Sequence, residues 1–182
     1  MAGSARSRSP EPRLPRADEL GVLPAIERRA GELLKGHEAY PVFAGHGLDL
    51  PTLQDGLQRG QLWVVDGIGG GIAGYLLAGE LSGDFHVLQM DVDPAHARRG
   101  HGRALLRHAL AQARADGYAA AVLTTLSDVP WNADFYASEG FVEVPEAEWS
   151  DGLRAVMAEE AALGFPMHLR VAMRRSISSL DG

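Results

Sequence analysis

The residues best suited to chemistry lie in positions 91–110, where an apolar run leads into a basic turn and then into a helical pattern. Gly100 and Gly102 let the backbone approach a ligand closely, and the N–H groups that begin a helix have no partner within it. These N–H groups and the helix dipole attract anions. Four arginines add positive charge to this segment: Arg98, Arg99, Arg103 and Arg107. The spacing predicts a pyrophosphate-binding turn, although a glycine-started helix with a solvated arginine face has the same pattern.

The elements on either side must hold this turn in place. Residues 85–92 form a short apolar run bounded by Gly83 and Pro94, which is typical of a strand. Apolar residues recur at helical spacing over 100–116, and the glycine that follows, Gly117, is typical of a helix end. The sequence therefore predicts a strand, a turn and a helix in that order.

The remaining patterns predict a mixed α/β sheet. Helices are expected at 17–35, from about Pro51, at 131–139 and at 148–163, with a loop at 37–46. Strands are expected at 12–16, 61–66, 72–81, 118–126, 141–144 and 167–175. In the second half of the chain the two kinds of element alternate, which is typical of α/β proteins.

Composition narrows the class of protein. The 182 residues, 46% of them apolar, suffice for one domain, and we expect it at 13–177 after a disordered tail over 1–12. No apolar run is long enough to span a membrane. The chain has no cysteine, which excludes disulfides, thiolate catalysis and Cys-ligated metals. The opening segment does not resemble a signal peptide, so we expect a cytoplasmic location.

The net charge of −7 is unevenly distributed. Residues 1–16 carry +3, which leaves −10 for the rest of the chain. An acidic body disfavours binding to nucleic acid, so an anionic ligand must be met by a local basic patch. We expect the arginines of 98–107 to form that patch.

The turn resembles the acetyl-CoA loop of the Gcn5-related N-acetyltransferase (GNAT) superfamily, whose pattern between a strand and a helix is Q/R-x-x-G-x-G/A. The matching residues are Ala97, Arg98, Arg99, Gly100, His101 and Gly102. Ala97 departs from the pattern, because Gln or Arg is usual there. The resemblance implies that residues 98–103, which end at Arg103, hold the pyrophosphate of acetyl-CoA, mostly through backbone N–H groups.

A second match follows in residues 124–141, where the superfamily places a helix carrying Asn and Tyr, then Gly-Phe and a strand. The matching residues are Asn132, Phe135, Tyr136, Gly140 and Phe141. The segment VPWN-x-x-FY is especially similar to that of a subgroup of uncharacterised bacterial acetyltransferases. Two matches in order are much stronger evidence than either one alone.

The resemblance implies the GNAT fold, a central mixed, mostly antiparallel, twisted sheet of about seven strands flanked by helices. The sheet is expected to splay between its fourth and fifth strands, here 85–92 and 118–126. The gap is the expected groove for acetyl-CoA. Main-chain groups of Met90, Asp91 and Val92 are expected to pair with the pantetheine arm as a strand edge would.

The resemblance assigns Tyr136 as the general acid for the departing thiolate, and Asn132 as a contact to the pantetheine arm or a bridging water. Each residue also has a structural interpretation. Tyr136 could pack beneath the last strands, and Asn132 could cap its own helix.

His86 is the candidate general base. It stands eleven positions before the first residue of the loop, where members of the superfamily often have Glu or His, and an imidazole titrates near neutral pH. Strand alternation predicts that His86 shares a face with Met90 and Val92. A half-buried histidine bonded to a backbone carbonyl is the alternative.

The expected acceptor is a small-molecule amine or a peptide N-terminus, with Tyr40 and Phe43 lining its pocket. Aminoglycosides, polyamines, amino acid derivatives and arylalkylamines are equally compatible with the sequence. Transfer is expected to be direct, in a ternary complex, because the chain has no cysteine and no activated serine. No metal site is expected. Such folds often dimerise, so a second copy is also an expected partner.

Two other functions fit parts of the sequence. Gly69, Gly71 and Gly74 have the G-x-G-x-x-G spacing of a dinucleotide-binding turn, but the glycine-rich residues that follow make a poor helix. The same glycines also suit a hairpin link between strands. A catalytically silent domain of the same fold, binding acyl-CoA or a partner protein, is the second alternative.

Overall fold

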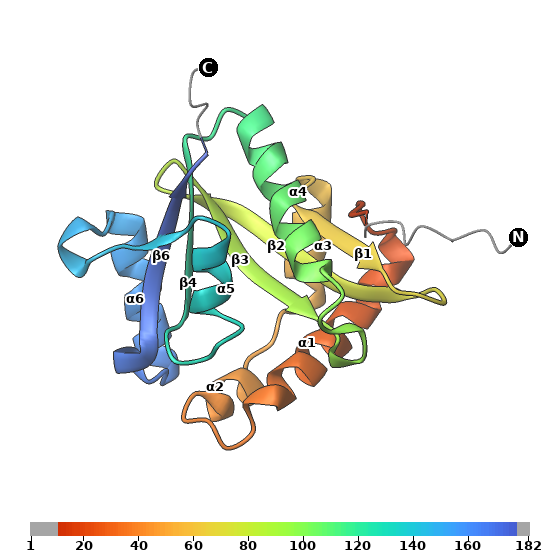
Figure 1. Cartoon of the computed structure of the whole chain (residues 1–182), viewed down its shortest axis with the longest axis horizontal. Helices are drawn as coiled ribbons and strands as arrows, with labels where there is room; N and C mark the ends of the chain where they lie inside the picture. Colours follow the sequence, from red (N-terminus) through yellow and green to blue (C-terminus); the bar gives the residue numbers. More distant parts are fainter. Residues whose placement is uncertain (1–10, 178–182) are drawn as a thin grey trace, which may run out of the picture.

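The computed structural model describes residues 11–177, which form a mixed sheet with helices packed on both faces (Figure 1). The strands are β1 (Leu62–Asp66), β2 (Ile72–Leu81), β3 (Asp84–Val92), β4 (Ala120–Leu126), β5 (Val142–Glu143) and β6 (Arg170–Ser176). Their order is β1-β2-β3-β4-β6-β5, and all neighbours are antiparallel except β3 and β4. The mixed, mostly antiparallel sheet expected from the sequence is confirmed.

The α-helices begin and end close to the predicted positions in most cases. They are α1 (Leu23–Gly31), α2 (Tyr40–Gly45), α3 (Leu50–Gln58), α4 (His101–Ala115), α5 (Ala133–Ser138) and α6 (Asp151–Leu163). Short 3-10 helices are η1 (Ala17–Val22), η2 (Glu32–Leu34), η3 (Pro94–His96), η4 (Glu146–Glu148) and η5 (Met167–Leu169). No helix in residues 11–177 is both long and apolar enough to cross a membrane.

Two predictions about the first helices are wrong in detail. The single helix expected over 17–35 is divided into η1, α1 and η2, and the loop expected at 37–46 contains α2. Both α1 and α2 have a proline in their first turn, Pro24 and Pro41. Proline lacks an N–H and is favoured where a helix begins, so each of these prolines begins a helix.

The sheet is buried on both faces by two apolar clusters. On one face, here called the α4 face, Leu105, Leu106 and Ala109 of α4 belong to the same cluster as Leu76 and Phe85 of the sheet. On the opposite face, called the α1 face, a second cluster joins η1, α1 and α3 to the sheet; it contains Leu20, Leu23, Ile26, Leu53, Tyr75 and Leu77. Figure 1 shows α4 and α3 on opposite sides of β1 and β2. Burial on both faces explains why β2 reads as a continuous apolar run.

The expected splay between β3 and β4 is present. β3 pairs with β2 along its whole length, but with β4 only at Phe85↔Ala121 and His86↔Val122. From Val87 to Val92, no strand in the described part of the chain pairs with this edge of β3. The open edge leaves backbone N–H and C=O groups free to pair with a ligand.

A β-bulge overturns the predicted side-chain alternation of β3. Met90 lies opposite Leu76, whereas His86 lies opposite Gly79, with a register shift between Leu77 and Ala78 of β2. The extra residue in β3 reverses the faces on its two sides. His86 therefore shares the α1 face with Gln89 and Asp91, and the prediction that it shares a face with Met90 and Val92 is wrong.

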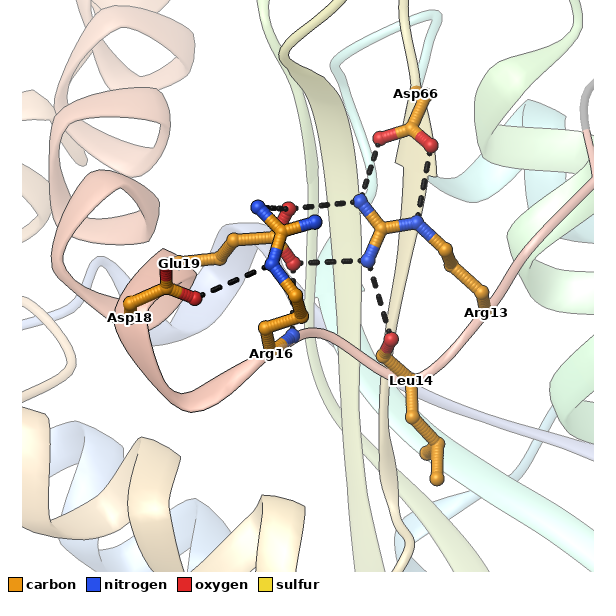
Figure 2. A network of polar contacts seen from close by, with 6 residues as sticks. All are labelled: Arg13, Leu14, Arg16, Asp18, Glu19 and Asp66. Carbon is orange, nitrogen blue, oxygen red and sulfur yellow. Dashed lines mark hydrogen bonds and ion pairs between the residues drawn. The ribbon is translucent and has the colours of Figure 1, made fainter.

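The strand expected at 12–16 is reduced to a single bridge, Arg13↔Val64, which explains why the sheet has six strands rather than about seven. Figure 2 shows the guanidinium of Arg13 between Glu19 of η1 and Asp66 of β1, with nitrogen–oxygen distances of 2.8 Å to each carboxylate. These ion pairs fix the start of the domain to the edge of the sheet. Residues 1–10 of the expected tail lie outside the described residues.

Candidate functional site

The glycine turn joins the open end of β3 to α4, as the sequence predicts. Asp93 follows β3, and its carboxylate accepts a hydrogen bond of 3.0 Å from the N–H of Ala95 in η3. Gly100 is the N-cap of α4 with φ +80°, and Arg98 has φ +60°. A positive φ suits glycine and is uncommon in other residues. The turn therefore stores some backbone strain at Arg98, next to the predicted ligand.

The turn presents a group of unpaired backbone donors. No side chain caps α4, and no described residue accepts a hydrogen bond from the N–H groups between Arg98 and Arg103. A Cβ on Gly102 would lie 3.7 Å from Val92 and 3.9 Å from Met90, so the helix start is packed closely against the end of β3. Consecutive free N–H groups at a helix N-terminus form an anion site, so the turn fits a pyrophosphate.

Two of the four arginines of this segment are engaged elsewhere. Arg103 and Arg107 both pair with Glu139, which ends α5 and has a side chain only 2% exposed. Arg98 and Arg99 are exposed and form no ion pair with any residue in 11–177. The positive charge available to an anion at the turn is therefore that of Arg98 and Arg99.

His101 contributes its backbone to the turn, while its ring is buried. The side chain packs edge-on against His96 with ring centroids 6.1 Å apart, and neither ring nitrogen of His101 has a described partner. Burial, with the nearby positive charges of His96 and Arg99, lowers the pKa of His101. The ring is therefore neutral at physiological pH. Within residues 11–177, no cluster of three or more His, Asp or Glu could hold a metal ion.

Tyr136 lies on α5, on the α4 face of the sheet. Its backbone N–H donates to the carbonyl of Asn132 at 3.0 Å, and its ring packs edge-on against Phe135 and Phe141. The side chain of Asn132 makes no capping hydrogen bond, so the capping interpretation is not supported. Burial, followed by the negative charge of Asp91, raises the pKa of Tyr136, while the charge of Arg170 opposes this. The phenol is thus a proton donor at neutral pH.

Asp91 carries a hydrogen-bonded carboxylate beside the splay that the sequence analysis missed, because only its main chain was expected to bind. One of its oxygens, Oδ2, accepts hydrogen bonds from the Tyr75 hydroxyl at 3.0 Å and from Gln89 Nε2 at 2.7 Å. Tyr75 is completely buried. Burial raises the pKa of Asp91, although both hydrogen bonds act against the rise. The bulge in β3 was the missing information, since it decides which face each residue of the strand occupies.

His86 lies at the closed end of the splay, where β3 still pairs with β4. It is 7% exposed, and burial lowers its pKa while the charge of Glu160 on α6 opposes the shift. A neutral imidazole can accept a proton, so the chemistry of His86 remains compatible with a base. No described hydrogen bond to a backbone carbonyl supports the alternative interpretation of His86.

Tyr40 and Phe43 lie on α2, which packs near the end of β4. Both contact a small apolar cluster that includes Leu126 and Val129, and the ring of Phe43 meets Phe165 edge-on at 5.2 Å. Nearby, His37 Nε2 lies 3.0 Å from the carboxylate of Asp128. The fold therefore brings the expected acceptor-side residues to the end of the strand that borders the splay.

The chain was compared with known proteins by sequence and by structure, and both comparisons find acetyltransferases. Residues 58–143 match the family model described as acetyltransferase (GNAT) domain. This segment contains the open strand, the glycine turn and α5.

Solved structures are similar over nearly the whole chain. The ribosomal-protein-S18-alanine N-acetyltransferase from Escherichia coli is 19% identical with a TM-score of 0.63, covering 93% of this chain and 95% of that one. The PaiA N-acetyltransferase from Thermoplasma acidophilum, in complex with coenzyme A, is 16% identical with a TM-score of 0.67, covering 92% and 99%. A GNAT-family acetyltransferase from Staphylococcus aureus is 15% identical with a TM-score of 0.69, covering 93% and 99%. At these identities the likeness establishes the fold.

Proposed function

Since this chain belongs to the GNAT superfamily, we propose that it is an N-acetyltransferase that moves the acetyl group of acetyl-CoA directly to a primary amine. The single observation that carries the proposal is the set of unpaired N–H groups between Arg98 and Arg103, next to the open edge of β3. Coenzyme A has a pyrophosphate followed by a pantetheine arm that contains amides. The N–H groups of the turn can bind the pyrophosphate, and the adjacent edge of β3 can pair with the amides. Three of the similar solved structures hold coenzyme A.

In the proposed complex, the turn binds the pyrophosphate through its N–H groups, and Arg98 and Arg99 add charge attraction. The pantetheine amides pair with the main chain of Met90, Asp91 and Val92 as an added strand would. Asn132, the N-cap residue of α5, makes no side-chain capping hydrogen bond, and its amide provides a further contact to the arm. This places the thioester between β3 and α5.

The chemistry that follows is acyl transfer without a covalent enzyme intermediate. The amine nitrogen attacks the thioester carbonyl carbon, the C–S bond breaks, and Tyr136 donates its proton to the departing thiolate. A phenol whose pKa is raised by burial and by the Asp91 charge keeps its proton until a stronger base forms beside it. Direct transfer is the simplest route because the chain has no cysteine.

The acceptor is a small-molecule amine or the N-terminus of a peptide. The similar proteins include one enzyme named for a protein acceptor, the ribosomal-protein-S18-alanine N-acetyltransferase, and one named for a small acetylated product, N-acetylglutamate synthase. Tyr40 and Phe43 lie on the acceptor side in this proposal, at the end of β4.

The test is an acceptor screen with detection of free thiol. The purified chain is incubated with acetyl-CoA and with spermidine, tyramine, glutamate, kanamycin or an alanine-terminated peptide. Release of thiol that depends on the amine supports the proposal. Thermal stabilisation by acetyl-CoA without thiol release for any amine favours the silent domain, and stabilisation by NADH but not by acetyl-CoA favours the dinucleotide-binding alternative.

A further inference from the structure

We infer that Asp91, rather than His86, takes the proton from the acceptor amine, and that the acceptor therefore enters as an ammonium cation. The inference rests on the proposed function and names a catalytic residue for it. It depends on the position of Asp91 at the splay, on its hydrogen bonds and on the charges around it.

The position follows from the register of the sheet. Asp91 lies opposite Tyr75 and so faces the α1 side, on the part of β3 that has separated from β4. Tyr136 approaches the same gap from the α4 side, where its ring packs against the main cluster. The negative charge of Asp91 contributes to the raised pKa of Tyr136. The Asp91 carboxylate and the Tyr136 phenol therefore lie on opposite sides of the proposed thioester position.

The hydrogen bonds of Asp91 orient one oxygen and leave the other free. Oδ2 accepts from both Tyr75 and Gln89, while no described residue donates to Oδ1. Tyr75 is fixed because its side chain is completely buried. A carboxylate held on one oxygen with the second unoccupied is arranged to receive one more donor, and an ammonium group supplies three such donors.

The charges that face Asp91 have one sign. Glu27 of α1 is half-buried, accepts a hydrogen bond from the N–H of Leu48 at 2.9 Å, and has its pKa raised by burial and by Asp91. The remaining titratable neighbours are the phenols of Tyr75 and Tyr136. No arginine or lysine in residues 11–177 forms an ion pair with Asp91 or Glu27. Two partly buried carboxylates, with no cation paired to either among the described residues, favour the entry of one, because an ammonium ion offsets their desolvation.

The proton transfers balance as follows. The ammonium gives one proton to Asp91 Oδ1, and the neutral nitrogen forms a C–N bond with the thioester carbon. The C–S bond breaks and the thiolate takes the proton of Tyr136. The second proton of the nitrogen returns to Tyr136 through water, and Asp91 later releases its proton to solvent. The products are the amide, free coenzyme A thiol and one proton.

The test compares Asp91→Asn with His86→Gln, two substitutions of similar size. The amine is the best acceptor found in the thiol-release screen, and kcat is measured from pH 5 to 9, with acetyl-CoA affinity measured by calorimetry. We expect Asp91→Asn to lower kcat about 100-fold or more and to abolish the loss of activity at acidic pH. Acetyl-CoA affinity is expected to change less than about twofold. His86→Gln and the exposed control Asp55→Asn on α3 are expected to keep the acidic limb of the pH profile, which is the fall of kcat toward low pH.

A second variant separates catalysis from folding. Tyr75→Phe removes a donor that stabilises ionised Asp91, so the pKa of Asp91 rises and the acidic limb moves to higher pH while the carboxylate remains. A merely structural role would lower stability without moving the limb. The inference is overturned if Asp91→Asn retains activity and the limb while His86→Gln loses them. If the wild type releases no thiol with any amine, the proposed function fails, and this inference fails with it.

Discussion

Arg103, in the first turn of α4, donates a hydrogen bond of 2.5 Å to Glu139, the residue that ends α5. Arg107, one turn later, adds a second ion pair of 2.8 Å to the same carboxylate. The helix that begins at the glycine turn is thereby fixed to the helix that carries Tyr136. Two arginines that the sequence analysis expected at the cofactor thus also connect the two helices of the proposed site.

Glu139→Gln is expected to lower the free energy of unfolding at pH 7 by about 1–3 kcal/mol, because a buried carboxylate with two charged donors is replaced by a neutral amide. Burial disfavours the ionised form of Glu139, but Arg107 and Arg103 outweigh it and hold its pKa below the ordinary value. The difference from the wild type should therefore be complete at neutral pH and disappear as pH falls through that pKa. Urea unfolding at several pH values measures it, with the exposed Glu143→Gln as the control. A pH-independent difference would contradict the ion-pair explanation.

Tyr136→Phe is expected to lower kcat about 100-fold or more and to leave acetyl-CoA affinity within about twofold of the wild type. The ring is retained, so its packing against Phe135 and Phe141 should persist. Because the pKa of Tyr136 is raised, the wild-type rate should not fall between pH 7 and 9 through loss of this proton. Thiol-release kinetics and calorimetry provide the measurements, with Tyr118→Phe as a matched control. Equal kcat in the two variants would remove Tyr136 from its proposed role.

The order of elements could be predicted from the sequence because it depends on local patterns. The apolar run of β3, the glycine start at Gly100 and the periodicity of α4 are each visible within about 20 residues. The splay was also anticipated, through the resemblance of two short motifs. What joins these elements, such as the pairing of Arg103 with Glu139, depends on residues far apart in the chain and could not be predicted.

The side-chain directions on β3 could not be predicted correctly from the sequence. Strict alternation predicts that His86 and Met90 share a face, and one bulged residue between them reverses this. Within β3 no glycine or proline marks that position, so this strand's own sequence carries no local signal for the bulge. The consequence is large, because the bulge puts His86 and Asp91 on the same face and gives the latter its partner Tyr75.

The double substitution Arg98→Ala, Arg99→Ala is expected to weaken acetyl-CoA binding about tenfold at low salt, which is about 1.4 kcal/mol. These two arginines are exposed and unpaired among the described residues, so the protein's stability should not change. The effect should shrink as salt rises, because exposed charges are screened. Calorimetry at low and at high salt checks this, with the exposed Arg28→Ala on α1 as the control. An equal loss for the control would mean that general charge, rather than the turn, is responsible.

Arg13→Gln is expected to destabilise the domain by about 1–2 kcal/mol at neutral pH, a value reduced from the full effect of the pKa shift because the pair is partly exposed. The hydrogen bonds from Arg13 lower the pKa of Glu19 from 4.5 to about 2. A carboxylate whose pKa is depressed in the folded state stabilises it above the unfolded pKa and loses that contribution as pH falls. The difference between wild type and variant should therefore be constant above about pH 5 and vanish as pH approaches 2. Chemical denaturation across this range, with Arg28→Gln as the control, measures it. A difference that persists at the lowest pH would show that the Arg13 side chain acts through a contact that is not an ion pair, such as its hydrogen bond to the carbonyl of Leu14, rather than through Glu19.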